Sequence, residues 1–254
     1  MKEKIFDMKI EAVTVCVNYS DYLAHTLPFN KYIFDHLTVV TTPDDKDTAN
    51  VCEFYHIQCV KTNAFGKDFN KARGINVGLS YLSRSDWICI FDSDILFLPR
   101  SRYLLEIAGL QKDCLYSAHR MMCPSYEAFA EWLVKPTVET ECDIYLHNKS
   151  FPLGTQIGKL TKDPKDPADL GWTALGYLQI FNENGGPHKY YPENHPGFAT
   201  SDLQFSYNWP RHKRILIPEF NVLHLSTDDN DKMGKNWNGR NTKRFGPAVK
   251  DINV

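Results

Sequence analysis

Short apolar runs alternate with helix-spaced apolar positions through the first half of the chain. The runs are rich in β-branched and aromatic residues, and they predict buried strands at residues 10–18, 37–42, 57–60 and 86–91. The segments between them predict helices at residues 21–34, 45–55 and 69–83. Strands that alternate with helices indicate an α/β fold with a mostly parallel sheet flanked by helices.

The second half has a less regular pattern. It predicts helices at residues 127–134 and 201–209, the second capped by Ser201, and strands at residues 176–181 and 215–225. Residues 159–171 are rich in Pro, Asp and Lys, which predicts a loop. We expect one domain over residues 1–225, and a basic C-terminal extension over residues 226–254 that packs on the functional site or caps it.

Composition narrows the class of protein. The chain of 254 residues is 43% hydrophobic and 24% charged, which excludes a disordered or fibrous protein. Lys and Arg (29) nearly balance Asp and Glu (31), so a basic surface for a polyanion must be local. No apolar run approaches the ~20 residues of a membrane-spanning helix, so we expect no membrane insertion.

The N-terminus and the cysteines indicate the cellular compartment of the protein. The first residues are charged and include no apolar core of signal-peptide length. The seven cysteines are odd in number and form no CxxC pair, which favours reduced thiols and argues against a zinc site. We therefore expect a cytoplasmic protein, in the host cytoplasm if the chain is viral.

Polar residues follow three of the predicted strands. Ligands of an open parallel sheet bind beyond the carboxyl ends of its strands. The chain has no GxGxxG, P-loop, HExxH or GxSxG motif that would place a site elsewhere. We expect one crevice lined by the residues at these strand ends, namely Asn18, Tyr19, Thr41, Asp44, Asp92 and Asp94.

Asp92 and Asp94 are the sharpest feature of this crevice. Four apolar residues precede them and four follow, and residues two apart on an extended chain project to the same side. Two neighbouring carboxylates repel each other unless a cation lies between them, and a hard divalent ion suits oxygen ligands. The alternative is an Asp-rich turn whose side chains bind only local backbone.

These acids belong to a longer pattern that resembles a known family. The segment FNKARGINVG at residues 69–78, followed by DSD at residues 92–94 and then Leu98 and Pro99, resembles the metal-dependent glycosyltransferases of the GT-A fold. It is closest to the β-1,4-galactosyltransferases and more loosely similar to glycosyltransferase family 2. The resemblance implies a Rossmann-like GT-A fold, in which the two acids bind Mn²⁺ or Mg²⁺ and the diphosphate of a nucleotide sugar.

The resemblance also extends downstream. Asp202 corresponds to the catalytic base of those enzymes, although Ser201 replaces the Glu that precedes the base in the family. His224 corresponds to a late metal-ligand histidine. Without the family, Asp202 is equally an acid favoured by the dipole of a helix first turn, and His224 is a satisfied core histidine.

Together these residues predict inverting transfer of a sugar from a UDP-sugar to a hydroxyl acceptor. Asp92, Asp94 and His224 would hold the metal, and Asp202 would accept the proton of the hydroxyl. The donor pocket would comprise Asn18, Tyr19, Thr41, Asp44, Asn70 and Asp92, with Lys71 and Arg73 at the diphosphate. The alternative for Lys71 and Arg73 is a solvated helix face.

The acceptor is predicted from basic and aromatic residues. We assign to it Trp172, Tyr177, Arg211, Lys213, Trp237 and Arg240, of which Trp172 and Tyr177 are alternatively core residues. Basic residues interleaved with aromatics suit a nucleic acid, so the first prediction is 5-hydroxymethylcytosine in DNA, as for bacteriophage-type DNA glycosyltransferases. The alternatives are a saccharide of cytosolic polysaccharide or glycolipid synthesis, and a non-catalytic nucleotide- or nucleic-acid-binding module.

Overall fold

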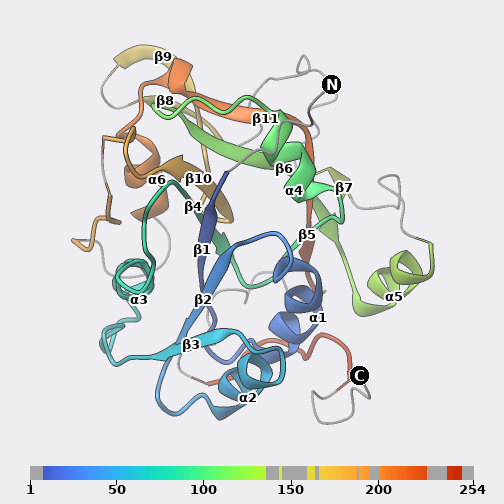
Figure 1. Cartoon of the computed structure of the whole chain (residues 1–254). Coiled ribbons are helices and arrows are strands. Elements are labelled where there is room, and N and C mark those ends of the chain that lie inside the picture. Colours follow the sequence, from blue (N-terminus) through green and yellow to red (C-terminus); the bar gives the residue numbers. More distant parts are fainter. Residues whose placement is uncertain are drawn as a thin grey trace.

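A mixed nine-stranded sheet forms the centre of the protein in its computed structural model (Figure 1). The structure describes residues 8–135, 143–144, 159–163, 166–187, 189–194, 201–227 and 239–247. Across these residues the strand order is β3-β2-β1-β4-β10-β6-β11-β5, with β7 (Asp143–Ile144) paired to β6. A separate two-stranded sheet lies beside it.

The first half of the sheet is parallel, as the alternating pattern predicts. Its strands are β1 (Ile10–Val15), β2 (His36–Thr41), β3 (Gln58–Lys61) and β4 (Trp87–Asp92). The connecting helices are α1 (Ser20–Asn30), α2 (Lys46–Phe54) and α3 (Lys71–Leu79). The prediction of a mostly parallel sheet flanked by helices is therefore confirmed.

The second half introduces antiparallel pairs. β10 (Leu178–Asn182) runs antiparallel to both β4 and β6 (Leu115–Cys123). β11 (Arg214–Leu225) is parallel to β6, and β5 (Ile95–Phe97) is antiparallel to β11. As a result β4, β6 and β11 point the same way, and their carboxyl ends lie at the same edge of the sheet.

The two faces of the sheet bury separate sets of side chains. Successive strand residues point to opposite faces, so Ile10 and Ala12 of β1 pack toward α1 and α2, whereas Val13 and Val15 pack toward α3. Figure 1 shows α3 on the opposite side of the sheet from α1 and α2. This two-sided burial explains why the β1 and β4 sequences are continuous apolar runs.

Several elements differ from the sequence prediction, among them β5 and β7, which were not predicted. Residues 159–171, predicted as a loop, contribute to a hairpin of β8 (Lys159–Asp163) and β9 (Asp166–Thr173), because backbone pairing forms despite the Pro and Asp content. β6 escaped prediction because polar His119 and Arg120 interrupt its apolar pattern. The short helix α4 (Ser101–Ile107) was also not predicted.

The remaining helices agree more closely with their patterns. α5 spans Tyr126–Val134 and is capped by Ser125, whose side chain accepts from the Ala128 amide. α6 spans Ser201–Ser206, shorter than predicted, and a 3₁₀ turn, η1 (Arg211–Lys213), leads into β11. α1 contains Pro28 and ends at Asn30, four residues before the predicted end.

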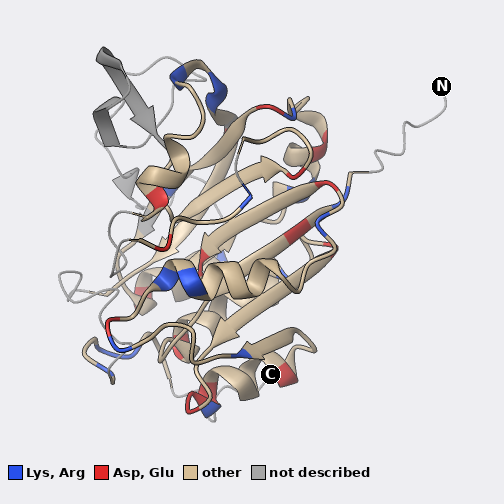
Figure 2. Cartoon of the chain, turned by 90° about the vertical axis from the view of Figure 1, so that its left-hand side faces the viewer, with Lys and Arg blue, Asp and Glu red and all other residues tan. Residues whose placement is uncertain are grey.

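Charged residues lie mostly at strand ends, on helices and in connections, while the strands themselves are largely uncharged (Figure 2). None of the described helices is long and apolar enough to cross a lipid bilayer. The six described cysteines are free thiols, five of them buried, in agreement with the prediction of reduced cysteines.

Candidate active site

Side chains from four separate elements meet at the carboxyl edge of β4. Asp92 is the last residue of β4 and pairs in register with Val15, the last residue of β1. Asp94 lies just beyond β4, and its carbonyl accepts a hydrogen bond from the Leu225 amide at the end of β11 (2.9 Å). His224 comes from the end of β11, Lys71 from the first turn of α3, and Asp202 from the first turn of α6. We call these five residues the acid cluster.

Asp94 and His224 form the most buried contact of the acid cluster. His224 Nε2 lies 3.2 Å from Asp94 Oδ2, and both side chains are 13% exposed. Burial by itself would raise the pKa of Asp94, but the adjacent His224 and then Lys71 hold it below its ordinary value. Asp94 is therefore ionised at neutral pH, as a metal ligand must be.

Lys71 forms an ion pair with Asp92. The Asn70 side chain accepts from the Arg73 amide and so begins α3 at Lys71, at the carboxyl edge of the sheet. Burial would lower the pKa of Lys71, but Asp92, followed by Asp202 and Asp94, holds it above its ordinary value. Lys71 is thus the internal counter-charge of the three acids, rather than part of a solvated helix face.

Asp92 has the opposite electrostatic environment to Asp94. Burial raises the pKa of Asp92 and Asp94 adds to the rise, while Lys71 opposes it. The two acids that the sequence pairs are therefore inequivalent, since one faces the lysine and the other the histidine.

Asp202 is held by a tight approach to Gly176. Its Oδ2 atom accepts a 2.7 Å hydrogen bond from the Gly176 amide, and a Cβ atom at Gly176 would lie 2.7 Å from the Cβ atom of Asp202. Gln179 also donates to the Asp202 carbonyl. The glycine is needed because a larger residue there would displace the carboxylate.

Two carboxylate oxygens of the acid cluster have no hydrogen-bond partner within the described chain. Asp94 Oδ1 and Asp202 Oδ1 are both buried from solvent yet receive no hydrogen bond. An unpaired oxygen of a buried carboxylate is costly, and such groups are rare in folded proteins. Their chemistry suits a cation at Asp94 and a proton donor at Asp202.

A divalent cation fits Asp94 and His224, with Asp92 joining only if Lys71 releases it. No group of three or more His, Cys, Asp or Glu side chains is preassembled around a metal position in the part of the chain that the structure describes. A hard cation held by one or two protein ligands takes its other ligands from diphosphate oxygens and water. These two metal-ligand candidates therefore suit a metal that binds together with a nucleotide.

The predicted donor residues at β1 and β2 lie in one network. The Asn18 amide donates to Asp45 Oδ2 (2.7 Å), and the Thr41 hydroxyl donates to the same oxygen (2.9 Å). Asp45 also caps α2 through the Thr48 amide, whereas Asp44 is exposed. The structure thus joins Asn18 and Thr41 through Asp45, which the sequence prediction passed over in favour of its neighbour Asp44.

The other predicted donor residues lie at the starts of two helices, Asn70 and Arg73 at α3 and Tyr19 at α1. Asn70 donates to the Glu193 carbonyl (2.8 Å), and Arg73 lies 3.6 Å from the Glu193 carboxylate on the protein surface. The segment containing Glu193 was not predicted to contribute, because its polar pattern lacks periodicity. Tyr19 is buried beside Tyr22, with ring centroids 5.5 Å apart.

Of the predicted acceptor aromatics, Tyr177 is a core residue. Its side chain is 4% exposed, its hydroxyl donates to the Ala118 carbonyl (2.7 Å), and Arg120 packs over its ring. The alternative of a core position is therefore correct for Tyr177. Trp172 lies in β9, of which only the backbone is described, and Trp237 lies outside the described residues.

The predicted basic acceptor residues are not brought to the acid cluster. Arg211 and Lys213 precede β11 at the end opposite His224, and Lys213 pairs with Asp113 (2.7 Å). A strand of this length separates its ends by tens of ångströms at about 3.3 Å per residue. Arg240 is near Asn18, but all five of its N–H groups donate to protein oxygens. These contacts account for its N–H groups, and its assignment to an acceptor stays a prediction.

Comparisons with known proteins give a partial similarity. No protein-family model and no curated protein matches the sequence. Mannosyl-3-phosphoglycerate synthase from Rubrobacter xylanophilus has a TM-score of 0.36 and 18% identity, over 45% of this chain and 41% of that one. Glucosyl-3-phosphoglycerate synthase from Mycobacterium tuberculosis, solved with Mn²⁺, UDP-glucose and phosphoglyceric acid, has a TM-score of 0.36 and 16% identity, over 45% and 44%.

The matched part is less than half of this chain and less than half of either synthase. At this level of similarity the comparison carries no argument about activity, metal or acceptor. Those conclusions must come from the residues of the acid cluster.

Proposed function

We propose that the protein is a metal-dependent glycosyltransferase that moves a sugar from a UDP-sugar to a hydroxyl acceptor with inversion. The observation that carries this proposal is the pair of unpartnered, buried oxygens, Asp94 Oδ1 and Asp202 Oδ1, in one acid cluster at the ligand-binding edge of the sheet. A protein that only bound a metal and a nucleotide would have no use for the unpartnered oxygen of Asp202, because that oxygen would lower stability without serving a reaction.

Asp94 and His224 would hold the divalent cation, which when bound neutralises charge on the departing diphosphate. Lys71 sits beside these acids and would supply a further positive charge to the diphosphate once the nucleotide is present. The nucleoside would lie beside the ends of β1 and β2, where buried Thr41 and Asp45 hold the backbone of Asn18.

Asp202 would act as the general base. The acceptor oxygen forms a bond to the anomeric carbon while the bond from that carbon to the diphosphate oxygen breaks, and UDP leaves. The hydroxyl proton passes to Asp202 Oδ1, which receives no hydrogen bond from the residues that the structure describes, while Oδ2 stays bound to the Gly176 amide. Attack from the side opposite the leaving group inverts the configuration of the anomeric carbon.

The described residues do not favour DNA over a saccharide as the acceptor. Arg240 is fully hydrogen-bonded within the protein, and Arg211 and Lys213 lie at the far end of β11. Both 5-hydroxymethylcytosine and a sugar present the hydroxyl that the proposed chemistry needs, so the experiment compares them directly.

The test is a donor and acceptor screen that measures UDP release. Each UDP-sugar is incubated with Mn²⁺, with and without a chelator, against plain DNA, hydroxymethylated DNA and simple saccharides. Chelator-sensitive release that requires a hydroxyl acceptor supports the proposal and identifies the acceptor. UDP binding with no release from any donor overturns it in favour of a binding module, and absence of both rejects the donor site.

Asp113→Asn is the matched control for variants of the acid cluster. Asp113 pairs with Lys213 at the opposite end of the sheet, and its side chain is 57% exposed. We expect this variant to retain full activity, because an exposed ion pair far from the crevice contributes little to folding or chemistry.

A further inference from the structure

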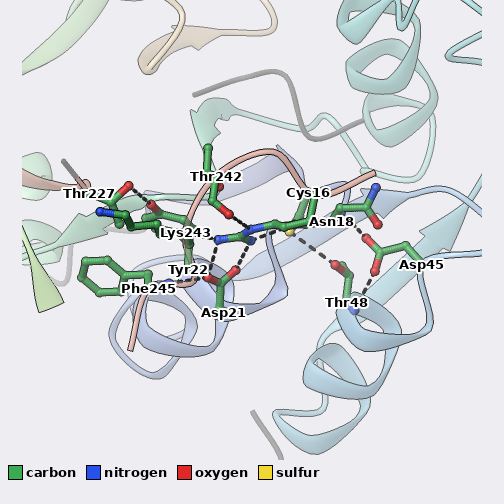
Figure 3. Close-up of polar contacts among 11 residues, drawn as sticks. Cys16, Asn18, Asp21, Tyr22, Asp45, Thr48, Thr227, Thr242, Lys243 and Phe245 are labelled. Atoms are coloured by element: carbon green, nitrogen blue, oxygen red, sulfur yellow. Dashed lines mark hydrogen bonds and ion pairs between the residues drawn. The ribbon is translucent and has the colours of Figure 1, made fainter. Parts of the chain in front are cut away.

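The C-terminal segment 239–247 returns to the start of α1, more than two hundred residues earlier in the chain (Figure 3). Asp21 is almost fully buried and accepts hydrogen bonds from both Arg240 Nη atoms (2.7 and 2.8 Å) and from the Phe245 amide (2.6 Å). We call the contact of Asp21 with this segment the clasp. It is a bidentate, charge-assisted arrangement, the strongest geometry available to an Arg–carboxylate pair.

Apolar packing reinforces the clasp. Phe245 is fully buried and stacks on Tyr22, with ring centroids 4.9 Å apart. The His25, Tyr126 and Phe129 rings surround it at 5.6–5.8 Å. The segment is therefore anchored to α1 and α5 by Phe245 as well as by the Arg240–Asp21 pair, so anchoring alone does not account for the further contacts of Arg240.

Arg240 reaches beyond Asp21 to the end of β1. Its Nη1 atom donates to the Asn18 carbonyl (3.0 Å), and its guanidinium lies 5.5 Å from the centre of the Tyr19 ring. On the other side, the Asn18 amide donates to Asp45 (2.7 Å). The backbone of Asn18 is thus held from both sides, by the C-terminal segment and by the cap of α2.

Asn18 needs this support because its backbone is in a disfavoured conformation. Its φ angle is +59°, in the left-handed region, which asparagine adopts more readily than most non-glycine residues but less readily than glycine. Such conformations persist where surrounding contacts hold them, and they concentrate at ligand sites. Asn18 stands where a ligand would meet the carboxyl end of β1.

We propose that Arg240 is a positioning residue for the nucleotide: by holding the Asn18 carbonyl and facing the Tyr19 ring, it sets the shape of the donor pocket at the end of β1. This inference rests on the proposed function. Arg240 does not touch the reacting atoms, and its effect is on donor affinity rather than on the chemical step.

The test compares Arg240→Met with Arg244→Met. Arg244 lies four residues away in the same segment, and its side chain is exposed, so it is a matched control. We expect Arg240→Met to raise both the Kd for UDP and the KM for the donor about tenfold, with kcat within about twofold, as lost ground-state binding predicts. Arg244→Met keeps the native values.

A merely structural role gives a different result. If Arg240 only stabilised the fold, a smaller fraction of the variant would be folded and active. The apparent kcat would then fall, while the Kd for UDP and the KM for the donor stay native. That outcome overturns the inference. If the native chain itself binds no UDP, the proposed function fails, and the two failures are therefore distinguishable.

Hydrogen exchange of the native chain gives a second test that needs no variant. Binding at the end of β1 and closure of the clasp stabilise each other reciprocally if they are coupled. Saturating UDP with Mn²⁺ is expected to slow amide exchange in residues 239–247 as well as in residues 16–24. Slowing confined to residues 16–24 contradicts the inference even if Arg240→Met does not fold.

Discussion

The acid cluster and the clasp are built from similar groups but differ in how completely those groups are satisfied. Each contains buried aspartate beside a basic side chain, and both lie at the carboxyl edge of the sheet. In the clasp, both Asp21 oxygens and all five Arg240 donors have partners. In the acid cluster, Asp94 Oδ1 and Asp202 Oδ1 have none in the described chain.

This difference separates two uses of buried charge. A fully paired arrangement stabilises the fold, because every buried polar group has a hydrogen-bond partner. Removing one partner leaves the other buried and unpaired, which costs free energy. An incompletely paired arrangement costs stability and is retained where a ligand or a reaction supplies the missing partner. The four predictions below test this distinction, from the largest expected effect to the smallest.

Asp94→Asn is expected to abolish the metal-dependent activity, with a loss of about 10³-fold or more, because a cation loses its only anionic ligand that is not engaged by Lys71. Mn²⁺ binding in the presence of UDP should disappear in a direct titration. The free energy of unfolding should change little, because losing the charged contact with His224 (3.2 Å) offsets the relief of the unpartnered oxygen Oδ1. Native Mn²⁺ binding by this variant would show that Asp94 is not a ligand.

Asp202→Asn is expected to lower kcat by about 10²–10⁴-fold while leaving the Kd for UDP unchanged, because the amide cannot accept the proton of the acceptor hydroxyl. The Asn oxygen can still accept from the Gly176 amide, so the fold is retained. Single-turnover rates and UDP titration measure the two effects separately. Full activity would rule out both the base and the inverting mechanism.

Asp21→Asn is expected to act on stability instead. It should lower the free energy of unfolding by about 2 kcal/mol, less than for a fully buried pair because the Arg240 side chain is 26% exposed. Denaturant unfolding measures the change, with Asp113→Asn as the exposed control. An Asp21→Asn protein as stable as the native chain would contradict a structural role for the clasp.

Lowering the pH from 7 to 5 is expected to destabilise the protein slightly through His25. Burial among aromatic rings lowers the pKa of His25, although Asp21 and a backbone hydrogen bond with Phe245 oppose the effect. The unfolded chain therefore binds a proton below about pH 6.5 that the folded chain excludes, so stability falls as the pH falls.

His25→Phe should reduce this pH dependence while keeping the aromatic packing. Thermal unfolding at pH 7 and pH 5 measures it. An unchanged difference between the two pH values would mean that other groups, such as His119, whose pKa burial also lowers, account for it.

Much of the fold followed from local pattern. The parallel strands β1, β2 and β4 were predicted because strands buried on both faces are continuous apolar runs. The edge strand β3, in which only Val60 is buried, was predicted from its short apolar run. β6 was missed because a sheet interior can accommodate His119 and Arg120 when tertiary partners cover them. The hairpin of β8 and β9 was missed because its strands form only when two segments pair with each other, and the amino-acid composition of a segment does not indicate such pairing.

Part of the candidate site was also predicted from the local pattern of apolar and polar residues. Asp92 and Asp94 were visible as acids between apolar runs, and the structure places Asp202 and His224 near them. Asp44 was preferred to Asp45 because nothing local distinguishes two adjacent aspartates; only the meeting of Asn18, Thr41 and Thr48 does. The roles of the acid cluster remain predictions.

The sequence by itself determined which residues form the strands and which acids stand at their ends, because periodicity and burial act over a few neighbouring residues. Only the tertiary structure decided which of those charges find partners. It brings Arg240 to Asp21 and Asn18, places Arg211 and Lys213 at the opposite edge, and leaves single oxygens of Asp94 and Asp202 without a partner among the described residues. Charge pairing depends on contacts between residues far apart in the chain, and no local pattern encodes them.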